Sequence, residues 1–321
     1  MAVGQQTSVS PNSVPWLFRA AKFIERYYIA YLFSLPSVLF LIGMLLVPMV
    51  AVVYLSFQQA NLLLPEAHGF VGIQNYLYVL QSEPFWQYFG HDLVWTFGSV
   101  IGEYAVGIST AVLLDQKILG RALFRGIIII PWLVPIAVAS VVWTWILDPS
   151  YGIFDYLLKQ FGLMPTAADW LGAPSLAMLS VVLINIWRSF PLYTIMLLAS
   201  LQAVPKDEIE AAFIDGAGAF KRFWTIKFPY LRMASVVLVV LNVMWVFNNF
   251  SFIWLLTQGG PITATTTPAV QIYVEAFQNL NFGDAAALAV CMIILLVLMF
   301  GVFRGFYALW ERTRKLRAPS L

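Results

Sequence analysis

The chain has 321 residues, of which 61% are hydrophobic and only 11% are charged, and its formal net charge is +2. A soluble domain carries roughly 25% charged residues, so the composition excludes an ordinary water-soluble protein and predicts that most of the chain lies in lipid. No basic patch interleaved with aromatic residues indicates a nucleic-acid partner, and the single cysteine excludes a disulfide within the chain.

The chain begins with residues 1–27, which we expect to form a cytoplasmic arm that is unstructured to about Ser13. The first apolar run is too long for a cleavable signal peptide and lacks a small-residue cleavage pattern. Six apolar segments then reach the length that a bilayer crossing needs, roughly 20 residues. They are Tyr28–Phe57, Leu93–Leu114, Phe124–Leu147, Ser175–Leu201, Met233–Leu256 and Ala285–Leu309. Residues 310–321 form a basic cytoplasmic tail after a membrane domain that covers residues 28–309.

Lysine and arginine lie almost entirely on one side of these spans. They occur in both terminal segments and in the second-to-third and fourth-to-fifth connections, whereas the other three connections hold only Lys159. Since cytoplasmic loops carry the excess of basic residues, we predict an all-α integral membrane protein of six transmembrane helices with cytoplasmic termini. The outer connections are long and polar without being basic, which suits an external partner.

The connection between the fourth and fifth spans, residues 204–229, contains the longest run of mixed charge in the chain. Pro205 suits the first turn of a helix, and the acidic residues that follow lie near the positive end of its dipole. Gly216 and Gly218 then interrupt the helix. We expect two small helices presented to a cytoplasmic partner; the alternative is a helix that lies on the membrane surface.

Polar residues inside the spans gather on both sides of this connection. They are costly in lipid and therefore face a cavity or a partner helix. Amides beside indole rings suit a sugar, whose hydroxyls bond to amides and whose C–H face packs on aromatic rings. Alternatively, the asparagines hold helices together through bonds of about 0.6 kcal/mol each. The candidate substrate-binding residues are Asn185, Trp187, Arg188, Ser189, Asn242, Trp245, Asn248 and Asn249.

The sequence also predicts how some of these residues are arranged. Asn242, Trp245 and Asn249 would share one face of a continuous fifth helix. Arg188 could pair with Glu103 of the second span, or it could meet a phosphate or an acidic sugar. We favour the ion pair, because an unpaired arginine inside a membrane is costly.

Several kinds of site are not indicated by the sequence. No phosphate-binding Gly-rich loop with a Lys-Ser/Thr ending occurs, so the chain is not expected to hydrolyse ATP itself. His68 and His91 lack ligand spacing, and no nucleophilic triad or carboxylate pair presents itself. We therefore expect no metal, no cofactor on this chain and no enzymatic activity.

The connection's spacing resembles the EAA loop of ATP-binding-cassette (ABC) importer permeases of type I. Phe228 stands where that family usually has leucine, and Met233 where a second proline is common. Asn185-Ile186-Trp187 and Phe247-Asn248-Asn249-Phe250 resemble the maltose-type branch of carbohydrate permeases. Further matches are Ser56-Phe57, Gly72, Asn75-Tyr76 and Phe282-Gly283, and the likeness extends from Tyr31 to Leu309. The residues that carry the EAA resemblance are Glu210, Ala211, Ala212, Asp215, Gly216 and Ala217.

The resemblance implies a permease subunit in the cytoplasmic membrane of a prokaryote, with the EAA residues docked on a separate ABC ATPase dimer that binds ATP and magnesium. It also implies a second permease subunit, an extracytoplasmic binding protein, and alternating-access import of a mono- or oligosaccharide. One alternative is import of glycerol-3-phosphate or another charged solute, with Arg188 as its cation. Another is a secondary transporter working alone, for which inverted repeats would be expected. A membrane scaffold without transport would leave the asparagines unexplained.

Overall fold

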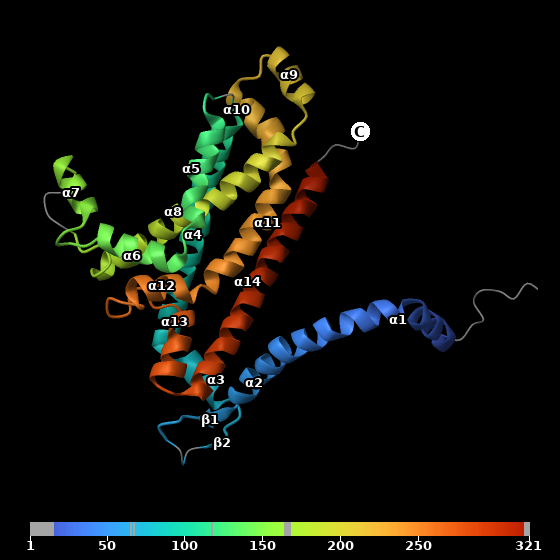
Figure 1. The fold of residues 1–321 in the computed structure, drawn as a ribbon, viewed down its shortest axis with the longest axis vertical. Helices are drawn as coiled ribbons and strands as arrows, with labels where there is room; N and C mark the ends of the chain where they lie inside the picture. Colours follow the sequence, from blue (N-terminus) through green and yellow to red (C-terminus); the bar gives the residue numbers. More distant parts are fainter. Residues whose placement is uncertain (1–15, 65, 67, 117, 164–167, 318–321) are drawn as a thin grey trace, which may run out of the picture. The chain divides into compact units, whose positions relative to one another are not determined.

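The computed structural model describes residues 16–317 except 65, 67, 117 and 164–167, and these residues are mainly helical (Figure 1). The segment to Ser13, which we expected to be unstructured, lies outside the described residues. The chain divides into two compact units, residues 1–54 and 55–321.

The first unit is a long apolar helix. It runs through α1 (Trp16–Leu41), the π-helical turn η2 (Ile42–Leu46) and α2 (Val47–Leu55). Its stretch Tyr27–Leu55 is long and apolar enough to cross a membrane, and no side chain in its most apolar window is buried. This agrees with the first predicted span to within two residues. The helix begins at Trp16, however, so part of the predicted arm is helical.

The second unit begins at its outer end with a pair of short strands and a short helix. Strands β1 (Gln58–Ala60) and β2 (His68–Phe70) pair antiparallel, and α3 (Gln74–Gln81) follows. Asn75 Nδ2 donates to the carbonyl oxygens of Ser56 and Gln58 at 3.0 and 2.9 Å, and the Ser56 and Tyr76 hydroxyls lie 2.5 Å apart. A Cβ atom on Gly283 would lie 2.4 Å from the Gln58 carbonyl oxygen. Four positions of the family resemblance that are far apart in the sequence, Ser56, Asn75, Tyr76 and Gly283, thus meet in one place.

Two long helices, α4 (Glu83–Asp115) and α8 (Pro174–Gln202), pack closely along their length. Small residues make the close approach possible, as is common between membrane helices. A Cβ atom on Gly102 would lie 2.1 Å from Ile186 Cδ1, and one on Gly107 would lie 2.4 Å from Tyr193 Cβ. These glycines therefore set the distance between the second and fourth spans.

The third predicted span is broken into two helices. We expected one helix over Phe124–Leu147, but α5 (Arg121–Leu133) and α6 (Ile136–Ile146) meet at an angle of 94°. Pro135 lacks an amide hydrogen and disfavours a helical conformation at the preceding residue, and Val134 is extended. The short outer helix α7 (Ile153–Gln160) follows.

The fifth predicted span, Met233–Leu256, is also interrupted. The apolar helix ends at Phe247, and a separate helix α12 (Phe250–Thr257) begins after two asparagines. Asn249 causes the restart, since its side chain accepts a hydrogen bond from Phe252 N at 3.1 Å and caps α12. The remaining outer elements are α13 (Pro268–Tyr273) and η4 (Val274–Gln278).

The last helix, α14 (Phe282–Arg317), continues past the predicted span end at Leu309 and takes in much of the predicted tail. In the part of the chain that the structure describes, five helices are long and apolar enough to cross a membrane, and the bent pair α5–α6 would be a sixth. This is a mostly helical membrane protein, as predicted. The two short strands are an addition that the sequence did not indicate.

Candidate functional site: a cytoplasmic helical hairpin and a buried polar cluster

The connection before the fifth span folds as two short helices, as predicted. They are α9 (Lys206–Ile214) and α10 (Ala219–Arg222), followed by the π-helical turn η3 (Phe223–Lys227) and then α11 (Phe228–Phe247). Pro205 is the residue before α9. Between the helices Gly216 has φ +73°, a left-handed conformation that favours glycine. We call residues 206–227 the hairpin.

Side-chain contacts fix the shape of the hairpin. Arg222 Nη1 donates to the Ala217 carbonyl oxygen at 2.5 Å, and the Arg222 guanidinium lies over the Phe213 ring, 5.2 Å from its centroid. The Tyr230 hydroxyl donates to Glu208 Oε1 at 2.6 Å. These contacts join α9 both to α10 and to the start of α11, so the two helices are held as one body.

The hairpin presents apolar side chains to its surroundings. Phe213, Ile214 and Phe220 are 68%, 84% and 79% exposed. Of the candidate coupling residues, Ala212 and Ala217 are half-buried, and the other four are exposed. A cavity of about 380 Å³ lies beside Glu210, Phe213 and Arg222. Such an exposed apolar surface marks a protein or membrane contact. Phe213 and Ile214 are not among the residues predicted from the sequence, although apolar residues between the motif positions of a polar connection would have indicated them.

One ion pair anchors the hairpin to the second span. Lys227 Nζ lies 2.6 Å from Asp115 Oδ2, and their side chains are 23% and 14% exposed. Since both side chains are mostly shielded from water, the pair is less screened than a surface pair.

Removing either partner of this pair is expected to loosen the hairpin from the second span. Asp115→Asn or Lys227→Met should each lower the free energy of unfolding by about 1 kcal/mol, visible as a lower unfolding temperature in detergent. The exchange Asp115→Lys with Lys227→Asp should recover most of the loss, whereas Lys221→Gln, which removes an exposed charge, should change little. An exchange variant as weak as the weaker single variant would contradict this expectation.

A buried carboxylate joins three spans at the centre of the second unit. Glu103 of α4 accepts a hydrogen bond from Asn185 Nδ2 of α8 at 2.8 Å through Oε1 and one from Asn242 Nδ2 of α11 through Oε2. These three residues are 0%, 2% and 8% exposed. The structure thus brings together two of the candidate substrate-binding asparagines. They meet around Glu103, which we expected to form an ion pair with Arg188.

The ion pair between Arg188 and Glu103, which we favoured, is wrong as a direct contact. Both carboxylate oxygens are taken by the two asparagines, and among the described residues Arg188 forms no ion pair. Arg188 is half-buried, and its Nε has no hydrogen-bond partner within the described residues.

Two further polar atoms near this cluster are unsatisfied within the described residues. They are the hydroxyl of Tyr193, which is 1% exposed, and Nε1 of Trp143 on α6. The Trp143 ring meets Trp187 edge to face, with centroids 5.3 Å apart. Trp143 is absent from our candidates, although an indole N–H inside a span needs a partner and is a signal in itself. Donors of this kind can bind hydroxyl or carboxylate oxygens.

The other candidates lie apart from this cluster. Asn248 Nδ2 donates to the Met244 carbonyl oxygen at 2.8 Å, and Asn249 caps α12. Trp245 is 63% exposed, whereas Asn242 is buried. The predicted common face of Asn242, Trp245 and Asn249 is therefore wrong, because the helix ends between them. Ser189 is half-buried on α8. In the described part of the chain, no group of three His, Cys, Asp or Glu residues could hold a metal ion.

Comparison with known sequences gives a consistent picture. The family described as binding-protein-dependent transport system inner membrane component matches residues 103–315. The trehalose/maltose transport system permease protein MalF of Thermococcus litoralis is 36% identical over 80% of this chain and 84% of its own length. The sn-glycerol-3-phosphate transport system permease protein UgpA of Agrobacterium fabrum is 33% identical over 71% of this chain and 78% of its own.

Solved structures share the fold at lower identity. A chain of a bacterial ABC transporter involved in the import of the acidic polysaccharide alginate superposes with a TM-score of 0.77 at 20% identity, over 94% of this chain and 100% of that chain. A chain of the bacterial alginate transporter in complex with an alginate pentasaccharide-bound periplasmic protein gives 0.75 at 20% identity, over 86% and 93% of the two chains.

Proposed function

Because the chain belongs to the family of binding-protein-dependent transport system inner membrane components, we propose that it moves a mono- or oligosaccharide across the membrane by alternating access. It is a multi-pass inner membrane permease of an ABC importer and not an enzyme. Membership of this family also removes the stand-alone secondary transporter from consideration.

The carbohydrate assignment is supported above all by the polar cluster around Glu103. Asn185 and Asn242 meet there, and Arg188, Tyr193 and Trp143 each keep a polar atom without a partner in the described part of the chain. Unsatisfied buried donors cost free energy, and a ligand rich in hydroxyl groups would satisfy them. The carbohydrate named for the Thermococcus relative agrees with this assignment.

The hairpin is the proposed contact with the ATPase dimer. Its apolar tips, Phe213, Ile214 and Phe220, are exposed on a body that internal contacts hold in shape. ATP and magnesium would bind to the ATPases, whose closure would move the hairpin and, through Lys227 and Asp115, the second span. A second permease subunit would complete the pathway, and a periplasmic binding protein, as in the alginate complex, would deliver the substrate.

Reconstitution tests the assignment. The chain would be placed in liposomes with its second permease, its ATPase and its binding protein, and screened with neutral sugars, acidic sugars and phosphate esters. A carbohydrate should stimulate ATP hydrolysis and be taken up. Stimulation by phosphate esters alone would refute the carbohydrate assignment.

A second candidate is an anionic solute such as glycerol-3-phosphate. It is favoured by Arg188, whose charge is not neutralised by a direct ion pair within the described residues, and by the name of the Agrobacterium relative.

Arg188→Gln separates the two candidates. A hydrogen bond to a charged group is worth about 1.5–3 kcal/mol, so uptake of a phosphate ester should fall at least tenfold in this variant. Uptake of a neutral sugar should stay within about threefold of the parent. Lys159→Gln, which removes a cation from an outer loop, is the control and should change neither. A tenfold loss with a neutral sugar would contradict a purely electrostatic role for Arg188.

A further inference from the structure

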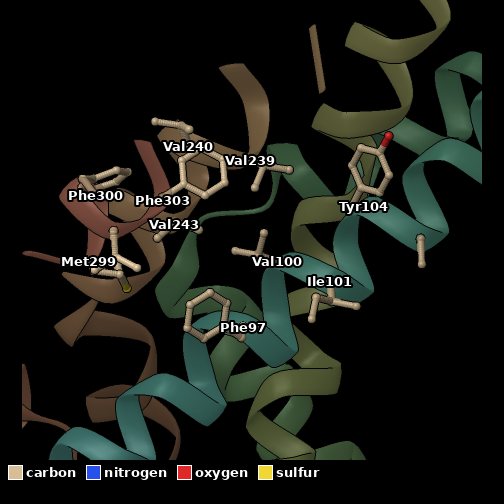
Figure 2. A pocket seen from close by; sticks show the side chains of 12 residues that line it. Phe97, Val100, Ile101, Tyr104, Val239, Val240, Val243, Met299, Phe300 and Phe303 are labelled. Carbon is tan, nitrogen blue, oxygen red and sulfur yellow. The ribbon is translucent and has the colours of Figure 1, made fainter. Parts of the chain in front are cut away.

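An apolar groove lies between three membrane helices, and one residue that lines it, Tyr104, packs edge to face on Tyr193 of the polar cluster. Its volume is about 510 Å³, and it is lined by α4, α11 and α14 (Figure 2). The side chains that line it are aliphatic or aromatic except for the thioether of Met299 and the hydroxyl of Tyr104, which bonds to Ser235 Oγ at 2.8 Å. The groove therefore offers no hydrogen-bonding group to a sugar.

The side chains that line the groove leave it open. Ile101 is 66% exposed and Phe303 is 42% exposed. Both lie within helices that are long and apolar enough to cross a membrane. The groove thus opens at the depth of the hydrocarbon core, where its natural occupant is a hydrocarbon chain.

Two arginines lie beyond the cytoplasmic end of the groove, on two of the helices that line it. Arg232 precedes Val239 by seven residues on α11, and Arg304 follows Phe300 by four residues on α14. At these spacings each arginine lies on the same helical face as the lining residue, roughly 6–11 Å along the axis. Since α11 leaves the cytoplasm and α14 returns to it, both lie beyond the same end of the groove. Arg304 is exposed at the end of the apolar stretch Phe282–Gly305.

We propose that this groove binds one anionic phospholipid, with an acyl chain between α4, α11 and α14 and the phosphate near Arg232 and Arg304. Basic residues between membrane helices on the cytoplasmic side are suited to anionic headgroups. Their positive charge would favour an anionic headgroup, whereas a purely apolar groove could not distinguish one headgroup from another. The proposal uses no property of the substrate, so it stands whether or not the substrate assignment is correct.

The test uses the assembled importer in nanodiscs that contain phosphatidylcholine with a small fraction of phosphatidylglycerol bearing a photoreactive acyl chain. Labelled peptides are identified by mass spectrometry. Peptides of α4 and α14 that line the groove should be labelled at least tenfold more by this lipid than by a photoreactive phosphatidylcholine.

Matched variants locate the site. Ala105→Phe, which fills the groove, should reduce the labelling at least fivefold, whereas Val106→Phe, at a neighbouring exposed position that does not line it, should not. Arg232→Gln with Arg304→Gln should remove the preference for phosphatidylglycerol. Lys159→Gln with Lys221→Gln, which removes the same charge elsewhere, should keep it.

Two results would overturn the proposal. One is equal labelling by the two lipids in the parent protein. The other is cross-linking of a cysteine at Ala105 to a helix of the second permease, because the groove would then be a protein interface. The surface variant Arg304→Gln leaves the groove side chains in place, so the test does not depend on whether Ala105→Phe folds.

Discussion

Gly216→Val is expected to uncouple ATP hydrolysis from uptake and to lower uptake at least tenfold. Gly216 has φ +73°, and a β-branched residue is strained in this conformation by about 1–3 kcal/mol. The turn would have to change, and the bond from Arg222 to the Ala217 carbonyl oxygen depends on that turn. The hairpin would then present its apolar tips in a different orientation.

Gly218→Val supplies the matched control. No atom lies within 4 Å of a Cβ atom built on either glycine, so neither substitution creates a clash. Gly218 has φ −64° and ψ 164°, which valine adopts readily. We expect near-normal uptake for this variant. Uptake and co-purification of the ATPase would be measured for both, and equal losses would show that added bulk, and not backbone conformation, is responsible.

Glu103→Leu is expected to give the largest loss of stability. It removes the acceptor of two interhelical hydrogen bonds and leaves the buried amides of Asn185 and Asn242 without their partner. Interhelical bonds in membranes are worth about 0.6 kcal/mol on average and up to about 1.7 kcal/mol. We therefore expect a loss of about 1–3 kcal/mol, visible as a lower unfolding temperature in detergent, together with loss of uptake.

Two companion variants show whether the hydrogen bonds are the cause. Glu103→Gln keeps the shape and one acceptor, and a rotated asparagine amide can accept from its new N–H, so most of the stability should remain. Asn185→Leu combined with Glu103→Leu should cost less than the sum of the single changes, because fewer donors are left unpaired. Strict additivity would indicate that Glu103 acts through packing alone.

Apolar length and the distribution of basic residues predicted the positions of the spans, and Pro205 with Gly216 and Gly218 predicted the helical hairpin. The two errors in helix continuity have local causes. Pro135 breaks the third span, and Asn249 ends the fifth by capping the next helix. A proline within a span indicates a kink, but the angle of 94° depends on what α6 packs against. A capping asparagine and a binding asparagine look the same in a sequence.

The candidate cluster was predicted in part. Asn185, Asn242 and Glu103 were recognised as polar residues inside spans, and the structure joins them. Their actual pairing could not be read from the sequence, because an arginine and two asparagines compete for the same carboxylate. The outcome depends on the distance between α4 and α8, which Gly102 and Gly107 set. Trp143 was missed because the bend brings α6 toward Trp187.

The contact between Gly283 and the outer strand pair has a consequence for how the protein is made. Gln58 leaves the ribosome early, whereas Gly283, whose missing side chain lets the Gln58 carbonyl approach, leaves it near the end of synthesis. The contact cannot form until the last helix has been inserted. A chain that ends before Gly283 would therefore leave the side of β1 that this glycine covers without its contact.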